Sequence, residues 1–240
     1  MISYNETSFG TLIKRPSKKI KSPYVGDIQV EDQECLGHCP SLGLGNILKC
    51  DSELLLSKSK NKNSKTDYVI EAVKEDNIWI GNVPLHANRL VKQLLEQNVL
   101  IENTSYIKPE YSMGDSRIDF YVKDSDNKEH FIEVKSVHIK DGGSAIFPVG
   151  YKKKKDATVS ERANKHVKHM TELASCGKNA YIIFVVQRED CVTFEPNRKT
   201  DPIFTELLQK AYETGVHIKA LQCSVSTESL QFLKEIPCII

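Results

Sequence analysis

Two β-rich runs joined by a turn-forming segment constrain the fold of this 240-residue chain most strongly. The runs are Arg117–Val122 and His130–Val137, and the residues between them, Lys123–Glu129, are rich in Asp, Ser and Asn. Such residues favour turns because their side chains bond to nearby backbone and tolerate left-handed conformations. The segment therefore predicts an antiparallel hairpin.

Side-chain alternation along this hairpin predicts which residues share a face. Successive side chains of a strand point to opposite faces, so Glu133 and Lys135 are expected on one side of the second strand. On the first strand, Asp119 is expected to face away from Ile118 and Phe120, whose shared face would be buried. The two acidic residues and the lysine are thus candidates for one polar site.

The register of the hairpin brings the two carboxylates together. A turn centred on Asp126 pairs residues whose numbers add to 252, which places Asp119 opposite Glu133. Like charges facing each other across a ladder destabilise it, and a hard divalent cation that accepts oxygen from both would relieve the repulsion. Lys135 would then lie beside the cation and a phosphate. The alternative is an ordinary salt bridge on a solvent-facing hairpin, since Glu-x-Lys triplets are common.

The N-terminal part of the chain predicts a small β-barrel or sandwich. Val, Ile, Leu and Tyr recur there in short runs broken by Gly and Pro. The polar segment Ser57–Thr66 is expected to form an exposed, mobile loop. The expected strands are Thr11–Arg15, Tyr24–Val30, Asn46–Leu56, Asp67–Val73 and Asn77–Ile80.

After residue 82 the pattern changes to strands interleaved with helices, which indicates an α/β or α+β domain over residues 83–240. Pro84–Asn98, Ser160–Ser175 and Asp201–Gly215 carry amphipathic or capped helix patterns. Ala180–Gln187 is a continuous apolar strand, and His217–Cys223 is a further strand. A polar loop is expected to follow the hairpin and run through Lys155.

Composition favours a protein of a reducing compartment. The seven cysteines are odd in number and scattered, unlike a disulfide framework, and no CxxC pair marks a structural zinc site around Cys35, His38, Cys39 and Cys50. The N-terminus lacks the apolar core of a secretory signal, and no apolar run approaches the roughly 20 residues needed to span a bilayer. We therefore expect a cytoplasmic, nucleoid or nuclear protein, not secreted and without a membrane partner.

Basic and aromatic residues indicate where nucleic acid would bind. The net charge is only +1, but Lys14, Arg15 and Lys19 lie in a basic N-terminal cluster, and Lys152–Lys155 form an uninterrupted run. Such residues are either solvated loops or contacts to phosphate. Trp79 could stack on an unpaired base or pack in the barrel. Arg162, Lys165 and His166 project from one expected helix, and Arg162 and His166, as i and i+4 neighbours, are suited to gripping phosphate.

The chain resembles the sugar fermentation stimulation protein (SfsA) family along most of its length. The resemblance is carried by Gly114–Phe120 and Glu133–Val137. Weaker matches in the same order include Gly10–Arg15, His38–Pro40, Gly81–Val83, Asn88–Val91, Phe147–Pro148, Glu161–Arg162, Lys165–His166, Val186–Arg188 and Asp201–Pro202. The chain departs from the family pattern at Ser41 and Leu42, at Val149 and at Ala163, which bears on substrate contacts more than on the carboxylates.

The resemblance implies an N-terminal OB-like barrel, here residues 1–82, and a PD-(D/E)XK nuclease-type domain. The nuclease motif falls on Asp119, Glu133 and Lys135, with Mg²⁺ expected as the cofactor and Mn²⁺ as an alternative. Glu110 matches an acidic position of the family and is either a further metal ligand through water or a surface carboxylate. The family is described as binding DNA without sequence preference.

Two functions follow from these residues. The first is a magnesium-dependent nuclease that hydrolyses phosphodiester bonds, with DNA favoured over RNA as the partner. The second is a non-catalytic, sequence-nonspecific DNA-binding regulatory protein. Adjacent carboxylates favour the first, because they would repel a phosphate backbone unless a cation intervenes. The sequence leaves open whether the chain forms a homodimer.

Overall fold

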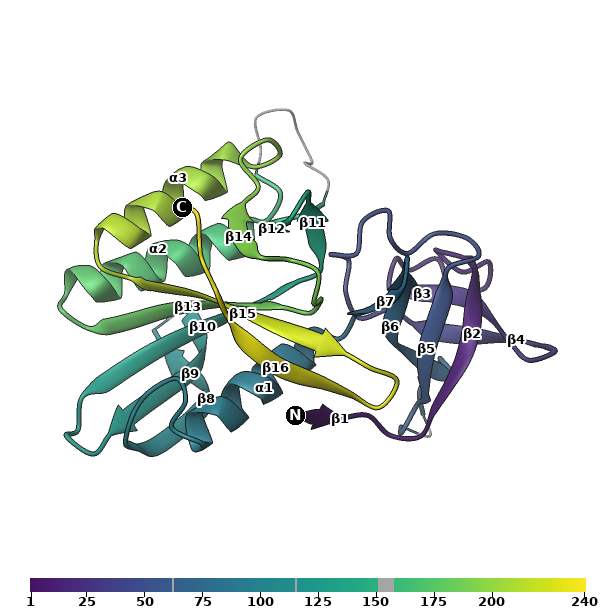
Figure 1. Cartoon of the computed structure of the whole chain (residues 1–240), viewed down its shortest axis with the longest axis horizontal. Helices are drawn as coiled ribbons and strands as arrows, with labels where there is room; N and C mark the ends of the chain where they lie inside the picture. Colours follow the sequence, from purple (N-terminus) through teal and green to yellow (C-terminus); the bar gives the residue numbers. More distant parts are fainter. Residues whose placement is uncertain (62, 115, 151–157) are drawn as a thin grey trace.

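A closed five-stranded barrel occupies the N-terminal part of the protein (Figure 1). The computed structural model describes residues 1–61, 63–114, 116–150 and 158–240. Its first sheet has the order β4-β3-β2-β5-β6-β7, and an additional parallel pairing of β4 with β6 closes the barrel. The barrel strands are β2 (Thr7–Lys14), β3 (Val25–Val30), β4 (Gln33–His38), β5 (Glu53–Lys58) and β6 (Tyr68–Glu75), and β7 (Ile78–Gly81) extends the sheet beyond β6. Inward-facing aliphatic side chains such as Leu12, Ile28 and Ile70 fill the barrel, as the alternation of apolar residues along the strands requires.

A seven-stranded mixed sheet forms the second part, with the order β1-β16-β15-β13-β10-β9-β8. Helix α1 (Pro84–Glu96) covers one face, and α2 (Glu161–Ser175) and α3 (Pro202–Glu213) cover the other (Figure 1). The strands are β1 (Ile2–Ser3), β8 (Thr104–Met113), β9 (Ser116–Asp124), β10 (Glu129–Val137), β13 (Asn179–Val186), β15 (His217–Val225) and β16 (Ser229–Ile236). A small third sheet joins β11 (Ile139–Asp141), β12 (Ser144–Phe147) and β14 (Thr193–Pro196).

The three helices begin where their sequences provide a start signal. Ser160 and Asp201 cap α2 and α3 by accepting hydrogen bonds from the backbone N–H groups of Ala163 and Phe204, both at 3.1 Å. Proline occupies the first turn of α1 and of α3, where its missing N–H costs nothing. Gly215, with a φ of +97°, follows the last turn of α3 and ends it.

A buried arginine joins the barrel to the α/β part. Arg188 is 1% exposed, and its guanidinium donates to Glu75 of β6 at 2.9 Å and to both oxygens of Asp190 at 2.6 and 2.8 Å. Its Nη1 also donates to the carbonyl of His138 at 3.0 Å, and Lys140 forms an ion pair with Asp190. We call these residues the Arg188 network. Leu55 and Ala72 of the barrel also pack into the core beneath α1, so apolar contacts and a charged network both hold the two parts together.

The structure confirms the fold class expected from the sequence, a mixed α/β chain with a small closed barrel before an α/β domain. Some local predictions are wrong. Ser57 is not in an exposed loop: it lies in β5, is 3% exposed and donates to the buried Glu71 at 2.5 Å. The expected polar loop after the hairpin instead contains strands β11 and β12, because it pairs with β14 from a distant part of the chain. The division at residue 82 remains a prediction, and β1, from the N-terminus, belongs to the larger sheet.

In the part of the chain that the structure describes, no helix is both long and apolar enough to cross a membrane. Every cysteine is a free thiol.

Candidate active site

The hairpin of β9 and β10 separates at the point where the carboxylates lie. Its ladder runs from Glu129 opposite Lys123 to Ile132 opposite Phe120, in the register predicted from the sequence. Beyond that pair, Oδ2 of Asp119 accepts a hydrogen bond from the backbone N–H of Val134 at 2.7 Å. The carboxylate thus satisfies a strand N–H that the ladder no longer pairs, which fixes Asp119 between the two strands.

The neighbours of Asp119 differ from the expected alternation. Ile118 and Phe120 are both 2% exposed, but Ile118 packs in the core beneath α2 and α3, whereas Phe120 packs in the core beneath α1. The prediction that they share one buried face is therefore wrong. Glu110, next to Asp119 on the neighbouring strand β8, has a φ of +51°, which interrupts regular strand geometry there. The second oxygen of Asp119, Oδ1, accepts from the side-chain amide of Asn88 on α1 at 2.8 Å.

Glu133 lies on the face of β10 that α2 covers. Its Oε1 accepts from Nζ of Lys135 at 2.6 Å and is also in contact with Nδ1 of His166 on α2. Nζ of Lys135 lies 3.3 Å from the same His166 nitrogen. The side chain of Glu133 is 4% exposed and that of Lys135 is 12% exposed, so this cluster is almost closed to water. Glu133 and Lys135 therefore share a face.

The two carboxyl groups have opposite electrostatic environments. Burial raises the pKa of Asp119, and the nearby charge of Glu133 raises it further, against the hydrogen bonds from Val134 and Asn88. Burial also opposes ionisation of Glu133, but the hydrogen bond from His166 and the charge of Lys135 outweigh it and lower the pKa of Glu133. Of the two carboxylates, Asp119 therefore carries the negative charge that its surroundings compensate less.

The donor set fits a hard divalent cation. Asp119 and Glu133 offer carboxylate oxygens close enough to influence each other's charge, and such oxygens are the ligands that Mg²⁺ and Ca²⁺ prefer. The side chain of Glu110 is 71% exposed and pairs with Arg117 at 3.6 Å, so its carboxylate is turned toward that residue. Within the described ranges, no three His, Cys, Asp or Glu side chains are already grouped as a metal site, so water would complete the coordination of a bound ion.

The residues predicted to bind nucleic acid lie in different parts of the molecule. On the barrel, Lys14 and Lys19 are exposed, but Nη1 of Arg15 is held 3.1 Å from the buried sulfur of Cys39. Trp79 is half-buried and stacks on the exposed ring of Phe9, with centroids 6.0 Å apart. The Lys152–Lys155 run lies outside the described residues.

Helix α2 separates the predicted residues that it carries. Arg162 and Lys165 are exposed, whereas the ring of His166 turns inward to Glu133. His166 therefore belongs to the carboxylate cluster. Asn88 had no role assigned from the sequence, and only its place in a motif of the resembled family singled it out. Neither spacing nor periodicity could have brought it to Asp119, because α1 and β9 meet only through tertiary packing.

The barrel, the α/β domain and the carboxylate pair beside a lysine together define a two-part α/β protein with one candidate acidic site. The family model for the "Sugar fermentation stimulation protein RE domain" matches residues 85–229. The chain belongs to the sugar fermentation stimulation protein family.

Relatives agree with this membership, and a solved structure shares the fold. A sugar fermentation stimulation protein homolog of Desulforamulus reducens is 37% identical over 216 residues, covering 89% of this chain and 87% of that protein. A homolog of Geotalea daltonii is 35% identical over 222 residues, covering 90% and 92%. The structure of Pyrococcus furiosus SfsA in complex with Ca²⁺ superposes with a TM-score of 0.86 at 23% identity, covering 100% of this chain and 98% of that one, and so shows the same fold.

Proposed function

We propose that this protein is a magnesium-dependent nuclease that hydrolyses phosphodiester bonds of nucleic acid, with DNA as the favoured substrate. The observation that carries the proposal is the placing of Asp119, Glu133 and Lys135 where β9 and β10 separate. Glu133 and Lys135 are nearly closed to water and Asp119 is half-buried. Two carboxylates placed beside a single lysine retain repulsion between like charges, which serves no structural purpose of its own. The Ca²⁺ complex of the Pyrococcus furiosus protein supports a divalent ion at this fold.

Each side chain has a distinct part in this proposal. Asp119 and Glu133 would hold the ion, with Glu110 contributing through water. When bound, Mg²⁺ or Mn²⁺ lowers the pKa of a water molecule and stabilises negative charge on a phosphate. The ammonium of Lys135, 2.6 Å from Glu133, would donate to an oxygen of the scissile phosphate. Asn88 orients Asp119, and His166 orients Glu133.

The direct test is cleavage of labelled single- and double-stranded DNA and RNA with Mg²⁺, Mn²⁺ or EDTA. We expect metal-dependent cleavage by the wild type and a loss of about 100-fold or more in Lys135→Ala, which removes one donor to the transition state. Lys199→Ala is the matched control, because Lys199 is 85% exposed and pairs with Asp141 at the surface.

The same assay separates the two candidate functions. Binding of nucleic acid without cleavage under every metal condition would leave the non-catalytic DNA-binding protein as the function. The absence of both binding and cleavage would exclude both candidate functions. A DNA substrate would locate the active protein in the cytoplasm or at the nucleoid.

A further inference from the structure

A row of tyrosines and lysines lies on the last two strands of the larger sheet, on the side that faces α2. Tyr106, Lys108 and Tyr111 belong to the edge strand β8, and Tyr121 and Lys123 belong to β9. In the ladder between these strands, Tyr106 is opposite Lys123 and Lys108 is opposite Tyr121. The rings of Tyr111 and Tyr121 pack against the core beneath α2, which fixes the side. We call these residues the tyrosine–lysine face.

The rings and ammonium groups of this face are in direct contact. Tyr111 stacks on Tyr121 with ring centroids 4.6 Å apart, and Tyr106 meets Tyr121 edge-on at 6.3 Å. Nζ of Lys108 lies 5.2 Å from the centroid of the Tyr111 ring, and Nζ of Lys123 lies 5.9 Å from the centroid of the Tyr121 ring. Because Tyr121 is only 7% exposed, it is the fixed support against which the more exposed rings pack.

A backbone irregularity places Tyr111 on this side of the sheet. In a regular strand, Lys108 and Tyr111 would point to opposite sides, because they are three residues apart. Glu110, between them, has a φ of +51°, which is unfavourable for a residue with a side chain. This break shifts the alternation by one residue, so that Tyr111 joins Tyr106 and Lys108. Backbone strain of this kind persists where the surrounding structure enforces it, and it clusters at functional sites.

The tyrosine–lysine face presents ring surface and positive charge to the outside. Tyr106 is 49% exposed, Lys108 is exposed and Lys123 is half-buried. Among the residues that the structure describes, neither lysine forms an ion pair with a carboxylate. Glu129, at the start of β10, is paired instead with Lys178 at 2.6 Å. The two ammonium groups are therefore complementary to an anion that binds from outside.

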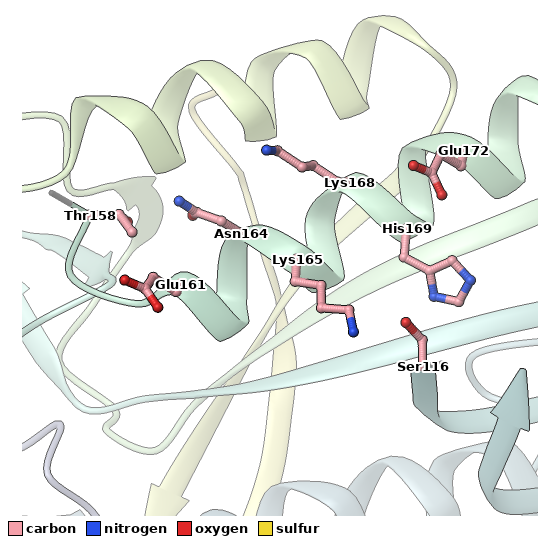
Figure 2. A pocket seen from close by; sticks show the side chains of 8 residues that line it. All are labelled: Ser116, Thr158, Glu161, Asn164, Lys165, Lys168, His169 and Glu172. Atoms are coloured by element: carbon pink, nitrogen blue, oxygen red, sulfur yellow. The ribbon is translucent and has the colours of Figure 1, made fainter. Parts of the chain in front are cut away.

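The face lies directly beside the candidate active site along β9. Tyr121 follows Asp119 by two residues and Lys123 follows it by four, which corresponds to about 7 and 14 Å along a strand. On the other side of Asp119, Ser116 lies beneath α2 and lines a pocket of about 430 Å³ together with side chains of that helix (Figure 2). Strand β9 therefore has accessible surface on both sides of the carboxylates.

We propose that the tyrosine–lysine face binds a single-stranded segment of DNA and leads it to the carboxylates. Unpaired bases would stack on the tyrosine rings while phosphates lie against Lys108 and Lys123, because aromatic rings combined with cations are the common surface for an unpaired strand. The bases of a duplex are stacked on one another and offer no free ring face. Cation–π contacts at exposed sites are weak, so bases and phosphates can replace them. This inference rests on the proposed function, since it names the form of the substrate at the same site.

Binding of labelled single-stranded DNA of about 16 nucleotides to the full-length protein in EDTA tests the face without requiring cleavage. We expect Tyr106→Ala to weaken this binding by about tenfold, because a stacked base loses its ring. Tyr106→Phe keeps the ring and should bind like the wild type. Neither variant should alter the binding of a duplex of the same length. Tyr212→Ala, at a tyrosine of α3 that is 58% exposed, is the matched control.

The two lysines are tested through the salt dependence of the same binding. For a single strand, the logarithm of the affinity falls with the logarithm of the salt concentration, with a slope of about −0.7 for each neutralised phosphate. Combining Lys108→Ala with Lys123→Ala should therefore make the slope shallower by about 1.4. Lys92→Ala, at an exposed lysine of α1 on the other side of the sheet, should leave the slope unchanged.

The outcomes separate this inference from the nuclease proposal. If Tyr106→Ala binds the single strand as tightly as the wild type does, or if the slope of the double lysine variant is unchanged, the face does not bind the strand, whatever the cleavage assay shows. An equal loss for single strand and duplex would overturn stacking on unpaired bases. If the variants behave as expected but Mg²⁺ and Mn²⁺ support no cleavage, the face stands and the nuclease proposal fails. Because Tyr106 and Lys108 are exposed, their variants should melt like the wild type, which thermal melting checks.

Discussion

The Arg188 network and the carboxylate site both bury charged side chains, but they balance them differently. In the network one guanidinium lies between two carboxylates, and hydrogen bonding from Arg188 lowers the pKa of Asp190 to about 2. At the carboxylate site, a single lysine lies beside two acidic groups, and of these two it donates a hydrogen bond to Glu133. Burial and the charge of Glu133 therefore raise the pKa of Asp119.

This difference indicates which cluster is complete by itself. A network in which each charge has a fixed partner serves to hold two parts of a structure together. A cluster that retains repulsion between like charges would, in our proposal, be completed by a bound cation, and such perturbed groups concentrate at functional sites. Four predictions test the distinction, from the largest expected effect to the smallest.

The first prediction concerns the removal of the central cation of the network. Arg188→Met leaves the carboxylates of Glu75 and Asp190 without their partner, and we expect a loss of about 3 kcal/mol in the free energy of unfolding. For a chain of this length the melting temperature should fall by roughly 6–12 °C. Chemical denaturation and thermal melting both measure this. A change as small as that of Lys199→Ala, at an exposed ion pair, would mean that the network is dispensable.

The second prediction concerns metal binding at the carboxylate site. A divalent ion at 100 times its dissociation constant should stabilise the folded state by about 2.7 kcal/mol and raise the melting temperature of the wild type. Glu133→Gln should abolish that rise. Glu133→Gln is easier to interpret than Asp119→Asn. Both oxygens of Asp119 accept hydrogen bonds, so the amide NH₂ group of an asparagine there would face one of these two donors and lose that hydrogen bond. If Ca²⁺ and Mn²⁺ leave the wild-type melting curve unchanged, the carboxylate site is another structural network.

The third prediction concerns the residue that orients Asp119. Asn88→Ala removes the hydrogen bond to Oδ1 of Asp119, and we expect a loss of about 1 kcal/mol in stability. The melting shift on addition of metal should also become smaller, because the carboxylate is no longer fixed. A normal metal-induced shift in this variant would show that the bond from Val134 suffices.

The fourth prediction appears only in acid. The pKa of Asp190 is about 2 in the folded protein and near its ordinary value of 3.8 when unfolded. Its ionisation therefore stabilises the fold above pH 4, and this contribution is lost as the pH falls toward 2. The pKa of Asp119 is raised, so its protonation opposes that loss. Asp190→Asn should flatten the decline of the melting temperature between pH 4 and 2; an unchanged decline would assign it to other carboxyl groups.

Much of the fold followed from local sequence signals. The helices were predicted to within a few residues because each begins at a capping residue or a proline and carries an apolar stripe. The register of β9 and β10 was predicted because the turn between them is short and rich in turn-forming residues. Strands β4 and β8 were among those missed: Gln33–His38 and Thr104–Met113 are mostly exposed or half-buried and lack a clean apolar alternation.

Only those features of the site that follow from regular strand geometry were predicted correctly. Regular alternation correctly placed Glu133 with Lys135, but it failed at Asp119, where the strands separate and the carboxylate takes up a backbone N–H. The contacts of Asn88 and His166 come from helices on opposite faces of the sheet. These contacts depend on how the helices pack on the sheet, and the spacing of residues along the chain does not encode that packing.

The pairing of β1 with β16 governs how the two parts of the protein can move. Because Ile2 and Ser3 pair with Leu230 and Ser229 of the larger sheet, the chain leaves that sheet near its start, builds the barrel and returns before α1. The barrel is thus connected to the α/β part by two segments of the chain, one after β1 and one before α1. A domain on one tether can swing in any direction, whereas one on two tethers can rotate only about the line that joins them. Any opening of the barrel away from the α/β part would follow that single axis, and one proteolytic cut in either connection would leave the halves still tied by the other.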